Sequence, residues 1–377
     1  MNFKNDAIIN LCQGIYDGPH ATPPMSDSGA IFLGISNITK DGYLDLTDIR
    51  YISDDDLEEW TKRVTPQEGD IVFSYEATLN LYGIIPKGFR GCLGRRMALI
   101  RPDNNKVLGK YLYYYFFSNK WREVIQKNTI TGATVDRIPL IKFPNFNIEY
   151  PEIDVQRKFV SVLSAYDSLI ENNQKQIELL EEAAQRLYKE WFEKKNLEIT
   201  SKKHSFRKIK LGEIASFVRG KTITSSEVKE GNVPVVAGGL EPAYYHNIAN
   251  TKAPVITVSG SGANAGFTNL YYEDIWASDC SFVDVESTKY PYYVFCFLKR
   301  NKAVLDNLQK GAAQPHVYAK DLNNIDLMLP DEIMLEKFEE TVSPIFKKIK
   351  CSLAEIKHLK EARYRLLPKL MNGEIEL

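Results

Sequence analysis

Two segments of the chain carry apolar residues at alternating spacings of four and three residues, one from Phe159 to Trp191 and one from Phe338 to Leu370. A seam of this kind, sustained over more than four heptads, predicts two long helices. Both seams require an apolar partner, so we expect the helices to pack on each other; the alternative is that each covers a globular core separately. The expected seam residues are Phe159, Leu163, Tyr166, Ile170, Asn173, Ile177, Leu180, Leu187, Ile345, Ile349, Ser352, Ile356, Leu359 and Leu366.

The second seam repeats the first at a constant offset of 179 residues, without a gap. Gly132 falls on Gly311, for example, and the same register continues through both helices. Asn173 and Ser352 put a polar residue at the same point of both seams, which fixes helix register at a cost in stability. Pro344 lacks a backbone N–H, so we expect a kink or a short break in the second helix, with the long straight portion nearer 344–370.

Short apolar runs separated by Gly, Pro, Asn and Asp fill the stretch before each helix, and they are typical of strands and loops. Residues 69–74 and 254–259 are such runs, and aromatic helices are expected at 110–121 and 291–301. Outside Gly132 and Gly311 the two stretches match poorly. We therefore expect an α+β chain of two mixed α/β domains, joined and separated by two helices that form a coiled coil, with an internal repeat whose ends are alike and whose middles differ.

The length of 377 residues is too great for one ordinary core and predicts two domains. Hydrophobic and charged contents of 44% and 26% are typical of globular proteins. No run approaches 18 apolar residues and the first residues form no signal-peptide pattern, so we expect a soluble, cytoplasmic protein. The five cysteines and five histidines are scattered, which predicts reduced structural thiols and no metal site.

The net charge of −1 argues against a nucleic-acid partner, but the average hides two stretches of opposite sign. Residues 41–76 contain 11 acids and 3 bases, whereas residues 87–142 contain 12 bases and 3 acids. An acidic flank beside a basic stripe fits a surface that meets phosphates on one side only. Solvated charges on a mixed surface are the alternative explanation of this pattern.

Three motifs resemble catalytic or nucleotide-binding sequences without their essential features. Gly220-Lys221-Thr222 resembles the end of a P-loop, but Ala215 stands where its first glycine belongs and no helix is expected to follow. Residues 260–266 have the wrong spacing for a dinucleotide-binding loop. Residues 22–25 lack the polar group and the aromatic ring of an adenine methyltransferase tetrad. We therefore expect a non-catalytic chain with no cofactor or metal of its own.

The C-terminal sequence Arg365-Leu366-Leu367-Pro368-Lys369-Leu370-Met371-Asn372-Gly373-Glu374-Ile375 resembles the signature of type I restriction–modification specificity subunits. Leu211-Gly212-Glu213-Ile214-Ala215 with Arg219-Gly220-Lys221 is similar to the opening of a target recognition domain, and Gly311-Ala312-Ala313-Gln314-Pro315-His316 to its closing segment. The resemblance covers nearly the whole chain. It divides the chain into a first target recognition domain (1–150), a central spacer helix (151–196), a linker (197–206), a second target recognition domain (207–330) and a C-terminal spacer helix (331–377).

The resemblance implies a non-catalytic DNA-specificity subunit with a division of labour. Two target recognition domains each read one half of a bipartite double-stranded DNA site, while antiparallel helices hold them apart and dock two methyltransferase subunits. Those partners carry S-adenosylmethionine and methylate adenine N6, and separate restriction and translocation subunits cleave DNA. A helix over 159–191 spans roughly 50 Å at about 1.5 Å per residue. One turn of DNA is about 34–36 Å, so we expect half-sites separated by roughly one turn or slightly more. The site should be asymmetric, because the pseudo-twofold repeat joins unlike domains.

The candidate DNA-binding residues are polar side chains in the expected loops, and an ordinary solvated loop residue is the alternative for each. Arg90, Arg95 and Arg96 lie in the basic stretch and suit contacts to phosphate or to a guanine edge. Asp17-Gly18-Pro19-His20 resembles a short family motif near the DNA side. The candidates are Asp17, His20, Ser74, Tyr75, Thr78, Arg90, Arg95, Arg96, Arg219, Lys221, Ser259, Ser261, Asn264, Gln309, Lys310, Gln314 and His316.

Two other classes of protein stay open at this point. An autonomous methyltransferase or nuclease would transfer methyl groups or cut DNA without partners, although the sequence shows neither a catalytic tetrad nor a metal cluster. A scaffold whose coiled coil binds only protein would have modules that no longer bind DNA. A steep salt dependence of DNA binding distinguishes a DNA reader from such a scaffold.

Overall fold

The computed structural model describes residues 2–132, 135–194, 206–309 and 315–375. The chain forms two compact units, a first unit of Met1–Ile170 with Lys357–Leu377 and a second unit of Glu171–Ile356. The unit boundaries fall within both long helices, so each unit contains part of each helix. The expected linker, residues 197–206, lies outside the described residues except for Phe206, where a strand begins.

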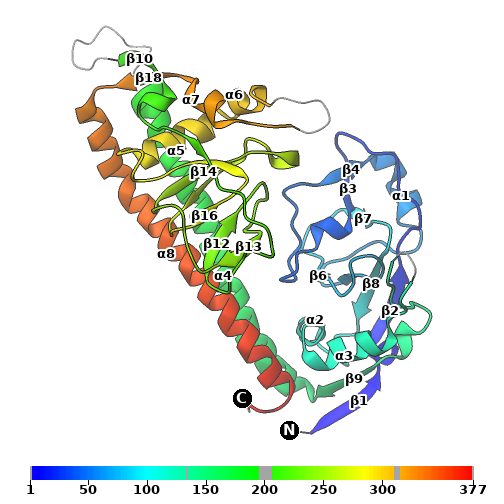
Figure 1. Ribbon diagram of the computed structural model, residues 1–377. Coiled ribbons are helices and arrows are strands. Elements are labelled where there is room, and N and C mark those ends of the chain that lie inside the picture. The colour runs from blue at the N-terminus through cyan, green and yellow to red at the C-terminus, as the bar shows by residue number, and fades with distance from the viewer. Residues whose placement is uncertain (1, 133–134, 195–205, 310–314, 376–377) are drawn as a thin grey trace. The chain divides into compact units, whose positions relative to one another are not determined.

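Both long helices that the heptad pattern predicts are present (Figure 1). Helix α4 runs over Ile153–Tyr188 and continues into a π-helical turn, Lys189–Lys194, whereas α8 runs over Glu332–Met371. The expected break at Pro344 is wrong, because α8 is a continuous helix through that position. Pro344 is exposed, so the carbonyl group that loses its helical N–H partner can be hydrated instead.

The first unit contains nine strands in three sheets among its described residues. A four-stranded antiparallel sheet has the order β2-β8-β5-β6, a three-stranded sheet has the order β4-β3-β7, and β1 pairs with β9. The strands are β1 Phe3–Ala7, β2 Cys12–Asp17, β3 Ala30–Leu33, β4 Arg50–Ile52, β5 Ile71–Ser74, β6 Tyr82–Ile84, β7 Gly91–Leu93, β8 Met97–Pro102 and β9 Asn147–Pro151.

The described residues of the second unit form the same set of sheets. The orders are β11-β17-β14-β15 and β13-β12-β16, and β10 pairs with β18. The strands are β10 Phe206–Lys210, β11 Val218–Arg219, β12 Val233–Val236, β13 Tyr244–His246, β14 Val255–Ser259, β15 Thr268–Tyr271, β16 Trp276–Ala277, β17 Cys280–Val283 and β18 Asp326–Pro330.

Strand directions agree between the units as well as strand order. In each three-stranded sheet the central strand has one antiparallel neighbour and one parallel neighbour, β7 beside β3 and β16 beside β12. In each two-stranded sheet the pairing is antiparallel. The two units therefore have one topology, although most of their sequences match poorly.

Short helices complete each unit, and one of them departs from the sequence-based expectation. The single helix expected at 110–121 is two helices, because Ser118 interrupts it and its hydroxyl group caps the second by accepting a hydrogen bond from the Trp121 amide at 3.2 Å. The short α-helices are α1 Leu57–Trp60, α2 Gly109–Tyr115, α3 Asn119–Asn128, α5 Pro291–Arg300, α6 Lys302–Asn307 and α7 Ala319–Asn323. Single 3₁₀ turns are η1 Ile8–Leu11, η2 Ile35–Asn37, η3 Asp54–Asp56, η4 Phe143–Asn145, η7 Leu211–Glu213 and η8 Gly262–Asn264.

The largest core of the first unit lies between its sheet, α2 and the two long helices. Tyr111 of α2 contacts Phe159 of α4, with ring centroids 6.2 Å apart. Leu163 of α4 and Leu367 and Leu370 of α8 belong to the same buried cluster. The early turns of α4 and the late turns of α8 thus share one core within this unit.

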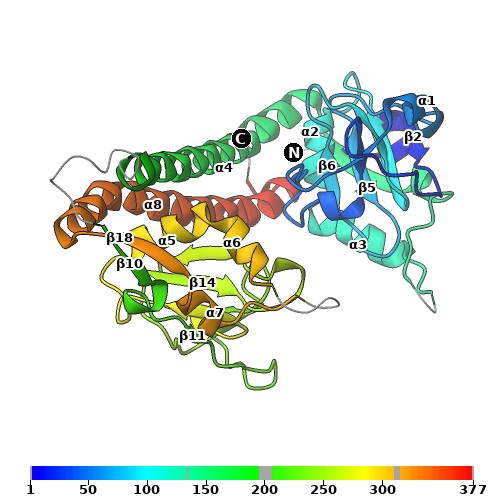
Figure 2. The ribbon, with the colours of Figure 1, turned by 90° about the horizontal axis from the view of Figure 1, so that it is seen from above.

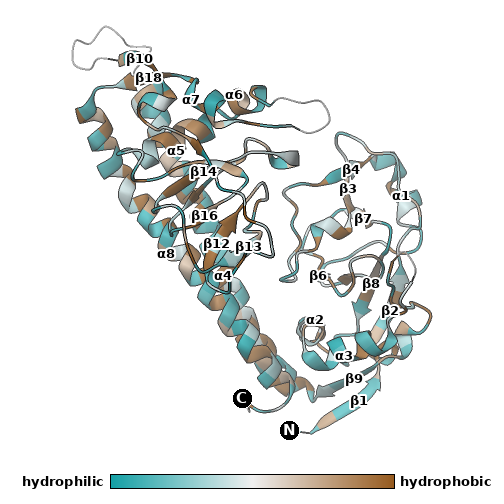
Figure 3. Ribbon diagram, viewed as in Figure 1, coloured by the Kyte–Doolittle hydropathy of each residue, from teal (hydrophilic) through white to brown (hydrophobic). Residues whose placement is uncertain are grey.

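The main core of the second unit is built around α5, which lies alongside α8 (Figure 2). The rings of Tyr292 in α5 and Phe346 in α8 stack with centroids 4.4 Å apart, and Tyr293 packs beside Tyr188 of α4. Phe338 of α8 is fully buried in the same cluster. The adjoining strands β12 and β14 are largely hydrophobic (Figure 3), which fits their burial. Here the late turns of α4 and the early turns of α8 share a core.

The expected seam residues are buried or half-buried, each within its own unit. The polar seam residues Asn173 and Ser352 are both buried in the second unit. The Ser352 hydroxyl has no hydrogen-bond partner among the described residues. The seam pattern thus identified the inward faces of both helices, including their polar position.

Among the described residues, none of the helices combines the length and the apolar character that a membrane span requires.

Candidate nucleic-acid interface

One end of the four-stranded sheet in the first unit is tied together by three backbone hydrogen bonds. Gly18 N, just after β2, donates to Met97 O at 2.9 Å, and Tyr75 N, just after β5, donates to Arg96 O at 3.2 Å. Ile138 N then donates to Tyr75 O at 2.7 Å. Three loops and the segment before Ile138 therefore converge at this sheet end.

The second unit has the same three hydrogen bonds at the corresponding sheet end. Gly220 N, just after β11, donates to Cys280 O at 2.8 Å, and Gly260 N, just after β14, donates to Asp279 O at 3.3 Å. Val317 N donates to Gly260 O at 3.1 Å. The matching bonds make individual loop positions of the two units equivalent.

Four equivalent positions at each sheet end carry polar side chains. We call them the first quartet and the second quartet: Asp17, Glu76, Arg96 and Arg137 in the first unit, and Arg219, Ser261, Asp279 and His316 in the second, in matching order. An isolated β-bridge joins the second and fourth members of both quartets.

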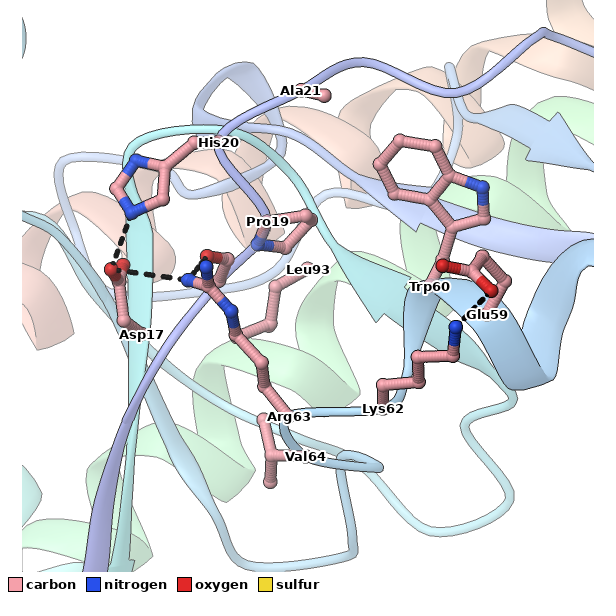
Figure 4. A pocket seen from close by; sticks show the side chains of 11 residues that line it. Asp17, Pro19, His20, Ala21, Glu59, Trp60, Lys62, Arg63, Val64 and Leu93 are labelled. Carbon is pink, nitrogen blue, oxygen red and sulfur yellow. Dashed lines mark hydrogen bonds and ion pairs between the residues drawn. The ribbon is translucent and has the colours of Figure 1, made fainter.

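Opposite charges meet within the first quartet and beside it. Arg96 Nε lies 3.2 Å from Glu76 Oε1, and both side chains are partly exposed. Asp17 lies at the end of β2. Its Oδ2 atom is 2.7 Å from His20 Nε2 and 3.3 Å from Arg63 Nη1 (Figure 4). The carboxylates at this sheet end are therefore held in place by neighbouring donors.

A cavity of about 430 Å³ opens beside Asp17 in the first unit (Figure 4). His20, Trp60, Lys62 and Arg63 contribute to its lining. Arg63 also donates to the carbonyl oxygen of Gly18 at 2.7 Å, which fixes the guanidinium group at the cavity wall. Asp17 and Glu59 also line the cavity and form ion pairs with these basic groups, so its wall carries both charges beside one aromatic ring.

The second quartet has its own ion pair and a smaller cavity. Arg219 Nη2 lies 3.4 Å from Asp279 Oδ1, and the Ser261 hydroxyl donates to Asp279 Oδ2 at 2.5 Å. Arg219, Asp279, His316 and Tyr318 contribute to a cavity of about 120 Å³, in which the rings of His316 and Tyr318 stack with centroids 5.9 Å apart. An arginine and a carboxylate therefore lie side by side at this sheet end too.

Several residues expected at a DNA surface are buried instead. Ser74 accepts a hydrogen bond from Leu81 N at 3.3 Å, and Ser259 donates to Gly238 O at 2.9 Å. Tyr75 is also buried, and burial together with the adjacent Asp17 carboxylate raises the pKa of its hydroxyl. These three side chains support the loops and are not part of the accessible surface.

The other expected residues are distributed over several loops. Thr78 and Arg95 are exposed near the first quartet, whereas Arg90 forms an ion pair with Asp54. Lys221 is exposed and lies over the ring of Trp276, 5.9 Å from its centroid. Asn264 is half-buried in η8, and Gln309 donates to Ala265 O at 3.0 Å. Lys310 and Gln314 lie outside the described residues.

Sequence reasoning missed Glu76, Arg137, Asp279 and Arg63. Arg137 corresponds to the expected residue His316 at the 179-residue offset, so the repeat itself carried a signal for it. Glu76 and Asp279 gave no such signal, because non-local strand pairing brings them to the sheet ends, and Arg63 reaches the first of these only through its contacts with Asp17 and Gly18. All five cysteines are free thiols, and all but Cys351 are buried. No group of metal-ligating residues was found among the described residues.

Comparisons with known proteins agree with this organisation. The family model of the type I restriction modification DNA specificity domain matches twice, over residues 28–182 and 204–351. The chain is 26% identical over 360 residues to the type I restriction enzyme MjaIX specificity subunit of Methanocaldococcus jannaschii, covering 87% of this chain and 82% of that protein. It is 25% identical over 372 residues to the putative MjaX specificity subunit of the same organism, covering 89% and 85%.

A solved structure supports the fold independently. The S subunit of the type I restriction-modification system from M. genitalium superposes with a TM-score of 0.55 at 18% identity, covering 98% of this chain and 96% of that one. The two matches of the family model together span most of the chain, one in each half. The chain therefore belongs to the family of type I restriction-modification DNA specificity subunits.

Proposed function

We propose that this chain reads a bipartite, asymmetric DNA site for a type I restriction–modification enzyme, with one half-site for each unit. The observation that carries this proposal is the pair of equivalent sheet ends. One topology presents four polar positions in each unit, and the side chains at those positions differ in charge and shape. A duplicated frame with unlike contact groups is what two different half-sites require.

The proposed spacer between the half-sites is set by α4 and α8, packed antiparallel as a coiled coil with a pseudo-twofold relation. The support is that early α4 shares a core with late α8 in the first unit, and late α4 with early α8 in the second. Helices of 36 and 40 residues measure roughly 54 and 60 Å at about 1.5 Å per residue. Such lengths suit half-sites separated by about one DNA turn or slightly more.

The same helices are proposed to dock two methyltransferase subunits. Large apolar side chains remain exposed on them, including Leu179 at 65% and Tyr364 at 69% exposure. Exposed apolar groups on a long helix suit contact with another protein. In this proposal the partners bind S-adenosylmethionine and methylate adenine N6, and restriction subunits join the same complex. This chain contributes DNA binding and orientation of its partners.

Methylated adenines mapped in a host that carries this chain with its methyltransferase partner test the proposal. We expect a motif of two unlike halves with an unread gap, and loss of that motif when the chain alone is removed. A palindromic or continuous motif, or methylation that persists without the chain, would contradict the proposal. Binding of the purified chain to DNA over a salt series separates it from a protein-only scaffold, because phosphate contacts give a steep negative slope.

A further inference from the structure

We propose that the first and second quartets are the base-reading groups of the two units, and that in each the arginine–carboxylate pair reads a G·C base pair. This inference rests on the proposed function, and it assigns the reading to specific residues. It begins from the backbone, because the same three hydrogen bonds fix the quartet positions in both units.

The loop conformations around the quartets are also the same. Ala77, which follows Glu76, has a φ of +69°, and the equivalent Gly262, which follows Ser261, has a φ of +76°. Both amides donate across to the neighbouring segment at 3.2 Å. Alanine rarely adopts this left-handed conformation, so its presence shows that the chain maintains the loop shape at a cost.

A second left-handed position recurs at the far end of the same loops. Asn80 has a φ of +65° and the equivalent Gly266 has a φ of +85°. In the part of the chain that the structure describes, the non-glycine residues with positive φ are Ala77, Asn80 and Arg96. Strained backbone thus concentrates at this sheet end of the first unit, as it does at binding sites in general.

Side-chain chemistry inverts on this common frame. Asp17 corresponds to Arg219, and Arg96 corresponds to Asp279, so the charge changes sign at two of the four positions. Groups that bind only phosphate would stay basic in both units, because the phosphate backbone is the same in both half-sites. Charge inversion instead fits positions that face bases, whose major-groove edges differ in donors and acceptors.

The carboxylates indicate which bases are read. A carboxylate near DNA is repelled by the phosphates. This repulsion is offset where the carboxylate accepts a hydrogen bond from an amino group of a base, above all from cytosine N4. The arginine beside it matches the O6 and N7 acceptors of guanine. Each unit therefore has one arginine–carboxylate pair, Arg96 with Glu76 and Arg219 with Asp279. Each pair offers a hydrogen-bond donor and an acceptor for one G·C pair or for two adjacent G·C pairs.

Substitutions that remove one charge at a time, in the full chain with its methyltransferase partner, test the assignment. We expect Glu76→Gln and Arg96→Gln to relax one G·C position in one half of the motif only. Asp279→Asn and Arg219→Gln should relax one position in the other half. In competition binding, we compare a duplex that carries the motif with one in which the read G·C pair is replaced. The ratio of the two affinities should fall about tenfold in each variant. The exposed carboxylates Glu68 and Glu241, changed to glutamine, serve as matched controls.

The outcomes separate this inference from the proposed function. A wild-type chain that gives no bipartite motif overturns the proposed function itself. A bipartite wild-type motif that survives all four substitutions overturns only the quartet assignment. Equal loss of binding to every sequence, with the motif unchanged, also overturns it, because that result identifies phosphate contacts. Arg96→Lys, which keeps the charge but loses the bidentate geometry, should resemble Arg96→Gln.

Discussion

The guanidinium group of Arg363 in α8 forms an ion pair with the carboxylate of Asp167 in α4, within the first unit. Arg363 also donates to the Tyr43 hydroxyl at 2.7 Å. Tyr43 and Tyr114 in turn donate to Asp167 at 3.0 and 2.5 Å. The pair therefore joins both helices to two tyrosines of the first unit.

The repeat places different residues at the corresponding positions of the second unit. At the 179-residue offset Arg363 corresponds to Ala184, and Asp167 corresponds to Phe346. Both of these residues are buried in the apolar core of the second unit. One pair of helix positions thus carries an ion pair in one unit and apolar residues in the other.

We expect Arg363→Met to lower the free energy of unfolding of the first unit by about 2 kcal/mol, because it leaves the Asp167 carboxylate partly buried without its cation. The side chains are 14% and 22% exposed, so the loss should be smaller than for a fully buried pair. Urea unfolding of the full chain measures it. The double variant Asp167→Asn with Arg363→Gln should recover part of the loss. A double variant less stable than Arg363→Met would contradict this account.

Glu339 in α8 gives a pH dependence with a definite sign. Its carboxylate accepts a hydrogen bond from the Tyr293 amide at 2.7 Å, which lowers its pKa. Burial has the larger effect and raises the pKa from 4.5 to about 7. The folded state therefore favours the protonated form, and this contribution to stability is present below about pH 4.5 and is lost as the pH rises through 7. Relative to Glu339→Gln, wild type should lose about 2 kcal/mol between pH 5 and pH 8. Thermal unfolding at matched pH values measures it, and a constant difference would contradict the assignment.

Tyr82→Phe removes only the buried hydroxyl group that accepts a hydrogen bond from Trp121. Trp121 Nε1 donates to the Tyr82 hydroxyl at 2.7 Å, and both side chains are fully buried in the first unit. The variant leaves the indole N–H without a partner, so we expect a loss of about 2 kcal/mol in unfolding free energy. Tyr364→Phe, at an exposed tyrosine, is the matched control and should change stability little. Equal effects of both substitutions would rule out this explanation.

Gly262→Ala tests the shared loop conformation. The φ of +76° is unfavourable for alanine, but no atom lies within 4 Å of the added methyl group. We expect a loss of about 1 kcal/mol in stability and an unchanged DNA motif, because Ala77 already holds the equivalent position in the first unit. Thermal unfolding and methylation mapping measure the two effects. A changed motif would show that the loops do not share one conformation.

Sequence reasoning succeeded where local pattern decides structure. The heptad spacing from Phe159 and from Phe338 identified both long helices and the buried polar pair Asn173 and Ser352. The apolar runs at 69–74 and 254–259 contain strands β5 and β14. The helices follow from an apolar spacing of three to four residues and the strands from short apolar runs between turn residues, and the sequence displays both directly.

Prediction from the sequence failed where distant residues or single side-chain contacts determine the structure. The cap at Ser118 splits a predicted helix, whereas α8 continues through Pro344, which lies on an exposed turn where water can reach the carbonyl group without a helical partner. Glu76 and Arg96 meet only through the pairing of β5 with β8, which no local pattern encodes. Ser74 looks like a surface loop residue in the sequence, yet strand pairing buries it.

Footprinting of DNA by the full chain with its methyltransferase partner tests the central claim most directly. On a duplex that carries the methylated motif, we predict two protected patches whose centres lie about one helical turn apart, with an unprotected stretch between them. Arg96→Gln and Arg219→Gln should each weaken base protection in a different patch. A single continuous patch, or both patches weakened equally by either variant, would contradict the reading of two half-sites by two separate units.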